Sequence, residues 1–412
     1  MCAFPVGFWN YVDIANQDAS AVRDWADAGM TLTMGPNYGP AAAEVKKMRR
    51  ILDAAHEAGI RVILGDRRTP FTCCKDKGEA AYASDAKAAI KAIGKHPAIF
   101  GLHIGDEPGT EHFHSACRAM RIVKELAPHQ TPFHNLLPWY QGVHTRVGFA
   151  DWGEYLDTYT RESGCEFLCY DCYSQMNPGS EGWDMYFRNL NEFHAAARRN
   201  GIPFWTTLLS VGHFRYRCPK EDDLRWQLNT ALAHGAKGIL WFFFYMRAPH
   251  CNYRVPPVDE HCERTETYEW LSRVCRTFLK STAPVLENLT LRRVAHVGTS
   301  WGGTPGLDPS GRIARAVSQQ GTPIIVSEFD GPNESEWVMV VNNSQTDSTY
   351  ANIVVRGRKP TLGHVRWMGA EAKLDAKNPG EVNACAGEDY ISADMWLAPG
   401  QMELFRVEGH DA

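Results

Sequence analysis

The sequence predicts an α/β fold, a (β/α)8 TIM barrel followed by a small C-terminal all-β sandwich domain. The chain has 412 residues, enough for the roughly 250 residues of a barrel and one small domain. Over residues 1–288, short apolar runs alternate with helical patterns, which is typical of parallel strands joined by helical crossovers. Over residues 289–412, short apolar runs are separated by Gly, Pro, Asn and Asp, which favours a β-sandwich.

Eight strand–helix units follow one another, the number that closes a barrel. The expected strands are 4–9, 31–34, 61–65, 99–104, 133–137, 167–173, 203–209 and 238–244. The expected helices are 19–28, 41–58, 80–93, 111–126, 152–162, 183–200, 221–234 and 265–286. Gly59, Gly201 and Gly235 precede strands and fit left-handed helix caps. A doubly wound sheet is the alternative, but no glycine-rich phosphate loop follows the first strand.

Composition excludes several classes of function. The net charge of −5 gives no basic surface for nucleic acid, and no apolar run is long enough to span a membrane. The first residues lack a basic segment followed by an apolar core, so we expect no signal peptide. Twelve cysteines spread over a long chain predict reduced thiols and a cytoplasmic protein. The sequence does not indicate an oligomeric state.

Two adjacent acids end the fourth expected strand. Gly-Asp-Glu-Pro at 105–108 places Asp106 and Glu107 at the barrel mouth, where TIM barrels carry their catalytic groups. A carboxyl beside another carboxyl in a partly apolar recess has a raised pKa, which a general acid needs near neutral pH. The structural alternative is that Asp106 caps the next helix and Glu107 forms a surface ion pair.

The same four residues resemble the Asn-Glu-Pro acid/base motif of clan A glycoside hydrolases, at the same place in the barrel. This resemblance implies that Glu107 is the proton donor. The sequence departs from the motif twice. Asp106 replaces the asparagine, and the seventh strand region, 203–213, contains no acid where the clan has its nucleophilic glutamate.

His-Ile-Gly-Asp-Glu at 103–107 is also similar to the His-x-Gly-Gly-Asp-Glu signature of retaining β-hexosaminidases, less one glycine. In those enzymes the acetamido group of the substrate is the nucleophile, the aspartate orients it and the glutamate is the acid. Tyr170-Asp171 resembles the strand ends of chitinase-like barrels. Asp171 is therefore a candidate nucleophile, a base that activates water, or a hydrogen-bonded residue of the barrel rim. A carboxyl separation of about 5 Å would indicate retaining chemistry, and roughly 6.5–9.5 Å inverting chemistry.

Aromatic and polar side chains gather near the expected strand ends. Aromatic rings pack on the C–H faces of a pyranose, and polar groups bind its hydroxyls. Side chains alternate along a strand, so about half of these should point elsewhere. The candidates for sugar binding are Trp9, Asn37, Tyr38, Asp66, His103, Asn135, Trp139, Tyr173, Trp205, His213, Trp241 and Tyr245, with Asn10, His134 and Tyr140 as further neighbours.

Two cysteine patterns suggest metal chemistry. Cys165, Cys169 and Cys172 have the spacing of iron–sulfur ligands, but alternation along the sixth strand sends the last two to opposite faces. The pairs at 250–251 and 261–262, each His-Cys, lie in one loop and offer zinc ligands, with a proline-rich lid as the alternative. We expect no metal and no cofactor.

Taken together, the residues predict an enzyme, a glycosidase that cleaves a small oligosaccharide or glycoconjugate, with catalytic residues Glu107, Asp106 and Asp171. Long loops after the fifth and eighth strands favour exo action. The alternatives are a substrate-assisted β-N-acetylhexosaminidase using Asp106 and Glu107, a non-catalytic carbohydrate-binding barrel, and a radical or metal-dependent barrel enzyme.

Overall fold

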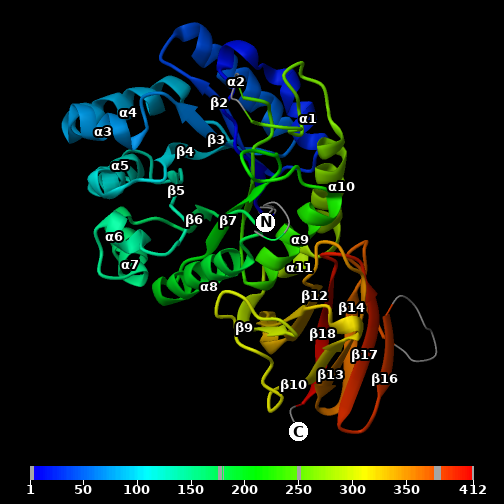
Figure 1. The fold of residues 1–412 in the computed structure, drawn as a ribbon. Helices are drawn as coiled ribbons and strands as arrows, with labels where there is room; N and C mark the ends of the chain where they lie inside the picture. The colour runs from blue at the N-terminus through cyan, green and yellow to red at the C-terminus, as the bar shows by residue number, and fades with distance from the viewer. Residues whose placement is uncertain (1–3, 175–178, 180, 248–251, 375–381, 411–412) are drawn as a thin grey trace.

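In the computed structural model, eight parallel strands form two four-stranded sheets, ordered β1-β8-β7-β6 and β2-β3-β4-β5 (Figure 1). The structure describes residues 4–174, 179, 181–247, 252–374 and 382–410. Single backbone hydrogen bonds link the two sheets at both edges. The Thr31 amide donates to the Val6 carbonyl (2.8 Å), and the Leu136 amide donates to the Cys169 carbonyl (2.7 Å). This arrangement is the one expected of a (β/α)8 barrel.

The elements follow the expected order with small shifts at their ends. The strands are β1 Val6–Phe8, β2 Leu32–Tyr38, β3 Arg61–Asp66, β4 Ile99–Asp106, β5 Phe133–Asn135, β6 Leu168–Asp171, β7 Phe204–Leu209 and β8 Ile239–Phe242. The helices are α1 Val22–Asp27, α2 Ala42–Glu57, α3 Phe71–Lys77, α4 Glu79–Ile93, α5 Phe113–Leu126, α6 Val143–Val147, α7 Trp152–Ser163, α8 Trp183–Asn200, α9 Glu221–Ala233, α10 Glu266–Ser281 and α11 Ala283–Leu286. Short 3-10 turns are η1 Ile14–Asn16, η2 Ala19–Ala21, η3 Thr110–His112, η4 Gln319–Gly321 and η5 Pro332–Glu334.

Three differences from the expected elements have local causes. The helices α3 and α6 are too short to show a helical repeat in sequence. The last expected helix breaks at Thr282, because Pro284 begins a new turn there and lacks the N–H that continuing the helix would need.

The three glycines expected to cap helices do so with left-handed backbones, at φ +72° for Gly59, +66° for Gly201 and +89° for Gly235.

Alternation along the strands separates a barrel interior from the outer core. On β6, Cys169 points inward and belongs to a cluster with Trp9, Phe133 and Trp205. Its neighbour Tyr170 points outward and stacks on Phe193 of α8, with ring centroids 3.8 Å apart. The period of two therefore aims every second residue of β6 into the barrel, and this series ends at its carboxyl end in Asp171.

Residues from Thr290 onward form two antiparallel sheets, drawn yellow to red in Figure 1 beside α9 and α11. The six-stranded sheet has the order β15-β14-β18-β12-β11-β9, and the four-stranded sheet β10-β13-β17-β16. Their bounds are β9 Thr290–Val297, β10 Ile313–Ser318, β11 Ile324–Asp330, β12 Glu336–Asn342, β13 Thr349–Arg356, β14 Arg358–Val365, β15 Glu371–Lys373, β16 Val382–Ala386, β17 Tyr390–Leu397 and β18 Met402–His410. Two antiparallel sheets packed together match the expected sandwich.

The six-stranded sheet is buried on both faces. Ile325 and Met339 pack into the same core as the helices around the barrel. Their neighbours Ile324 and Val338 pack against the four-stranded sheet. Hydrogen bonds add to this contact, since the Trp226 indole of α9 donates to Asn343 Oδ1 (2.9 Å). The two parts therefore share a continuous apolar layer.

Among the described residues, none of the helices has the length and apolar character needed to cross a bilayer. The ten cysteines within the described ranges are free thiols.

Candidate functional site

Three carboxyls and one amide converge at the carboxyl ends of β4, β5 and β6. Asn135, at the end of β5, donates from Nδ2 to Asp106 Oδ1 (3.0 Å) and to Asp171 Oδ1 (2.7 Å). The Cys169 thiol is 3.4 Å from Asn135 Oδ1 and donates to it, which fixes the orientation of the amide. Because β5 lies between β4 and β6, one side chain holds the carboxyls of both neighbouring strands.

Glu107 follows β4 directly and has an unusual backbone. Its φ of +42° lies in the left-handed region, which is uncommon for a residue with a side chain and is often found at functional sites. Its amide donates to the Asn135 carbonyl (3.0 Å), so the turn is tied to β5. Asn135 therefore ties both the Glu107 backbone, through its carbonyl, and the Asp171 carboxyl, through its amide (2.7 Å).

The surroundings raise the pKa of all three carboxyls. Burial, followed by the negative charge of Asp106, raises the pKa of Glu107 to about 7, although the charge of Arg146 acts against this. Burial, then the charges of Glu107 and Asp106, raises the pKa of Asp171 well above its ordinary value. Burial also raises the pKa of Asp106. The Asp106 and Glu107 side chains are exposed to solvent at the mouth of the barrel, and Asp171 is half-buried. Such a cluster retains a proton near neutral pH.

The floor of the recess is closed by Trp9 of the first strand region. Its indole donates across the barrel to Thr207 Oγ1 of β7 (3.1 Å), and the edge of His103 lies against it with ring centroids 5.5 Å apart. Burial lowers the pKa of His103 to about 4, so this imidazole is neutral and is not a proton donor at neutral pH. Thr207 and Leu209 take the inward positions of β7, so the second carboxyl of the site comes from β6.

An aromatic wall stands beside the carboxyls. Tyr173 packs against His213, Tyr216 and Phe242, with ring centroids 6.1, 5.6 and 5.6 Å apart. Burial, followed by the charge of Asp171, raises the pKa of Tyr173 well above its ordinary value. Of these residues, the sequence predicted Tyr173 and His213 as part of the site but not Tyr216 or Phe242.

Tyr11 and Arg247 also reach this wall and were not predicted. The pKa of Tyr11 is raised by burial and then by the charge of Asp106, with a smaller contribution from Asp171. Side chains alternate along an extended strand, so Tyr11, two residues after Trp9, is expected on the same side of the chain. This spacing could have predicted Tyr11 from the sequence. Arg247 lies in the loop after β8, where no periodic pattern indicates a direction.

Several of the proposed sugar-binding residues have other surroundings in the structure. Tyr38 and Asp66 are buried, and Asp66 forms an ion pair with Arg68 (2.7 Å). Trp241 is fully buried in the outer core. Tyr245 is nearly so, and its hydroxyl accepts a hydrogen bond from the Trp25 indole (2.7 Å).

The other sugar-binding candidates have partners outside the carboxyl cluster. Trp205 points inward, but at the amino end of β7, where it stacks on Phe167 with ring centroids 3.9 Å apart. The remaining candidates have local partners: Asn10 with Gln17, Asn37 beside Gly65, His134 with Tyr159, Trp139 beneath Arg188, and Tyr140 with Arg146. The structure therefore brings Trp9, His103, Asn135, Tyr173 and His213 together with the three acids.

The cysteine patterns do not form a metal centre in the described part of the chain. Cys169 points into the barrel, whereas Cys172 lies on the other face, within 3.6 Å of the Asn189 amide. No group of three or more His, Cys, Asp or Glu side chains suited to a metal ion occurs among the described residues. His250 and Cys251 lie outside those residues, and Cys262 is an exposed free thiol.

Comparisons with solved structures place this fold among glycoside hydrolases, whereas no protein family and no curated protein matches the sequence. A glycoside hydrolase family 5 structure from Bacteroides vulgatus ATCC 8482 has a TM-score of 0.60 at 10% identity, over 98% of this chain and 88% of that one. A family 39 glycoside hydrolase from Bacteroides cellulosilyticus WH2 has a TM-score of 0.52 at 12% identity, over 98% and 81%.

A β-galactosidase from the psychrophilic Marinomonas ef1 has a TM-score of 0.50 at 10% identity, over 66% of this chain. The chain spans 59% of that relative's length. At such identities the likeness concerns the fold alone, parallel strands followed by antiparallel sheets, and does not by itself assign an activity.

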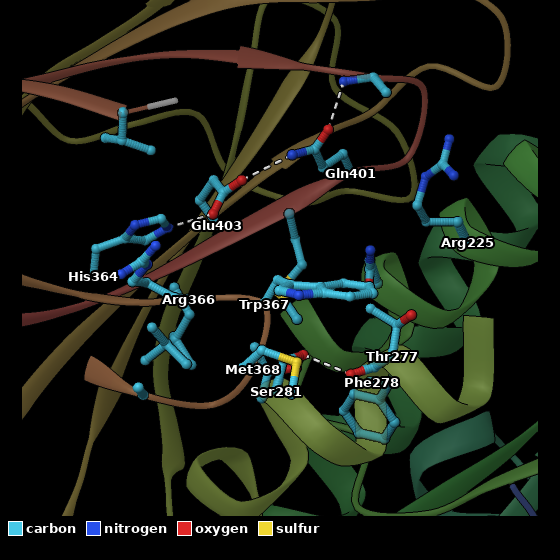
Figure 2. Close-up of a pocket in the computed structure, with 18 of the residues that line it drawn as sticks. Arg225, Thr277, Phe278, Ser281, His364, Arg366, Trp367, Met368, Gln401 and Glu403 are labelled. Atoms are coloured by element: carbon cyan, nitrogen blue, oxygen red, sulfur yellow. Dashed lines mark hydrogen bonds and ion pairs between the residues drawn. The ribbon is translucent and has the colours of Figure 1, made fainter. Parts of the chain in front are cut away.

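A second hollow, of about 1100 Å³, lies between α9, α10 and the six-stranded sheet (Figure 2). Trp367 projects into it with 68% of its surface exposed. Glu403 accepts hydrogen bonds from His364 (2.6 Å) and Gln401 (2.8 Å), and Arg273 pairs with Glu221 (2.7 Å). None of the three clustered carboxyls lines this cavity.

Proposed function

We propose that the protein is a glycoside hydrolase in which Glu107 is the general acid/base. The observation that supports this most strongly is the position of Glu107 directly after β4, next to Asp106, where burial and the charge of Asp106 raise its pKa to about 7. An acid whose pKa matches the working pH is protonated often enough to donate and is acidic enough to release its proton. The fold shared with glycoside hydrolases supports the same proposal.

The reaction follows from the positions of these groups. Glu107 gives its proton to the glycosidic oxygen as the bond between that oxygen and the anomeric carbon breaks. Asp171 faces Glu107 from β6 and forms the new bond to the anomeric carbon. Protonation of Glu107 removes the charge that helps to raise the pKa of Asp171, so Asp171 ionises more readily when Glu107 holds the proton. Water then releases the sugar and returns its proton to Glu107.

The grouping of the acids around Asn135 favours retention of configuration. Retaining enzymes hold their carboxyls about 5–5.5 Å apart, and inverting enzymes need roughly 6.5–9.5 Å to admit a water. Because Asn135 binds the Asp171 carboxyl through its amide and the Glu107 backbone through its carbonyl, the two acids are held close together, which favours the shorter spacing. Asn135 and Asp106 then act as positioning groups for Asp171.

A substrate-assisted β-N-acetylhexosaminidase is the second candidate. The observation that favours it is the enclosure of Asp171, because a carboxyl kept neutral by burial is a weak nucleophile. The acetamido group of the substrate would then attack the anomeric carbon, with Asp106 orienting it and Glu107 as the acid. Activity restricted to N-acetylated sugars and lost in Asp106→Asn would select this route.

The substrate is proposed to be a small oligosaccharide or glycoconjugate cut from its end, because the recess lies within the mouth of a single barrel.

A screen of chromogenic glycosides, N-acetylated ones included, tests the proposal with wild type and Glu107→Gln. Hydrolysis by wild type, and its loss in the variant, is expected. Proton NMR of the first-formed anomer reports retention. Absence of hydrolysis across the screen, or equal rates for the two proteins, would refute a catalytic role and leave a carbohydrate-binding barrel. Cleavage of long polymers alone would refute exo action.

A further inference from the structure

Arg247 is held between two tyrosine rings on the wall of the recess. Its Cζ lies 3.9 Å from the ring centroid of Tyr11 and 5.6 Å from that of Tyr253. Its Nη1 donates to the Tyr253 hydroxyl (3.0 Å). These contacts fix the plane of a half-buried guanidinium and leave most of its five N–H donors directed elsewhere.

The charge of Arg247 acts on the carboxyl cluster. It lowers the pKa of Asp106 and of Tyr11, over whose ring the guanidinium lies. The contacts that the structure gives Arg247 within the described ranges are to the two tyrosines, and none is an ion pair with a carboxylate. Arg247 is therefore a fixed positive charge close to the reacting groups but not bonded to them.

Two other sheltered arginines are paired with acids. Arg68 binds the buried Asp66 through both Nε (2.9 Å) and Nη2 (2.7 Å). Arg217 binds Asp223 with both terminal nitrogens (2.5 Å each).

The half-buried Arg61 and Arg254 donate instead to backbone carbonyls, those of Ile99 (2.9 Å) and Tyr216 (2.6 Å). Within the described ranges Arg247 donates to one hydroxyl only, so its guanidinium has lost hydration without replacing it, and its planar fork matches a carboxylate or sulfate.

We propose that Arg247 binds an anionic substituent of the sugar, so that the substrates are glycosides of hexuronic acids or of sugar sulfates. This inference rests on the proposed glycoside hydrolase function. A negative substrate would be repelled by Asp106, Glu107 and Asp171. Arg247 offsets that repulsion on one side of the recess and so selects the orientation in which the anionic group faces away from the acids.

The test compares matched pairs of 4-nitrophenyl glycosides, in both anomers: glucuronide with glucoside, galacturonide with galactoside, and galactoside 6-sulfate with galactoside. In wild type, kcat/KM for the anionic member is expected to exceed that for the neutral member about tenfold or more. Arg247→Met should reduce this ratio about tenfold or more, mainly through KM of the anionic member, and Arg247→Lys should retain part of it. A preference confined to the sulfate pair identifies sulfate as the anion.

The control is Arg61→Met, which removes an arginine lying over Phe100 (5.0 Å) at the amino end of β3. It should leave the ratio as in wild type. Neutral glycosides cleaved as well as anionic ones, or a ratio unaffected by Arg247→Met, would overturn the inference and leave the proposed function standing.

If neither class is cleaved, the proposed function fails. Calorimetric binding of glucuronate against glucose then tests Arg247 by itself. Tighter glucuronate binding that is lost in Arg247→Met supports the inference, and equal binding overturns it. Circular dichroism verifies folding, and Arg247→Lys replaces Arg247→Met if the methionine variant unfolds.

Discussion

The cavity of Figure 2 and the mouth of the barrel differ in how their charged groups are satisfied. In the cavity of Figure 2, Glu403 is bonded to His364 and Gln401, and Arg273 is paired with Glu221. At the barrel mouth, acids lie against acids, and the pKa of Glu107 is raised to about 7. Neighbouring groups of like charge with perturbed pKa values therefore indicate a functional site better than the volume of a cavity does.

The largest effect is expected from Glu107→Gln. General acid catalysis contributes about 10²–10⁴-fold, so kcat should fall by that factor on glycosides with poor leaving groups. Dinitrophenyl glycosides, whose leaving group needs no proton, should retain far more activity. The matched control is Glu111→Gln, four residues on, where the exposed acid pairs with Lys75 (3.2 Å) and normal rates are expected. Equal losses on both kinds of leaving group would contradict the assignment.

A smaller loss is expected from Asn135→Ala, which removes the amide that holds Asp106 and Asp171. A misplacement of about 1 Å can cost roughly 10²-fold. The hydrogen bond from Asn135 lowers the pKa of Asp171, so its removal raises that pKa. The acidic limb of the kcat/KM profile should therefore move to higher pH. A fall in kcat with an unmoved limb would argue that Asn135 acts only on structure.

Stability should depend on pH through Glu107. Its pKa is about 7 in the folded protein and near 4.5 in the unfolded chain, so the folded state binds the proton more tightly. Its contribution to stability is full below about pH 4.5 and is lost as pH rises through about 7. Glu107→Gln should therefore melt above wild type at pH 8 and close to it at pH 4. Scanning calorimetry measures both, and a variant that melts lower at pH 8 would refute the raised pKa.

The smallest effect is expected in the second hollow. Trp367→Ala changes an exposed side chain in a cavity that none of the three acids lines, so kcat/KM should stay close to that of wild type. A tenfold loss on a small chromogenic glycoside would show that the cavity of Figure 2 takes part in the reaction, and the contrast between that cavity and the mouth of the barrel would fail.

Sequence patterns predicted the order of the strands and the place of the acids, because both depend on local alternation. Asp106 ends β4, Glu107 follows it directly, and Asp171 follows the inward Cys169 by two residues. Patterns did not indicate that Asn135 links the acids, since that contact joins three strands far apart in the chain. They also did not separate Trp9, which faces the recess, from Trp241, which faces the outer helices, because strand ends shift by a residue or two.

Residues outside regular elements were the hardest to predict. Arg247 and Tyr253 belong to the loop after β8, where side-chain direction has no period. Tyr38 and Asp66 lie near strand ends as expected, yet the ion pair with Arg68 occupies Asp66. A polar residue near the barrel mouth can contact a ligand or form a local ion pair. Which of the two it does depends on the side chains that the fold places next to it.

The most direct test is the pH dependence of kcat/KM on a glycoside that wild type cleaves. If Glu107 delivers the proton, activity falls as pH rises through about 7, and Glu107→Gln shows no such limb in its residual rate. Wild-type activity that stays level to pH 9, or the same limb in both proteins, would show that another group supplies the proton.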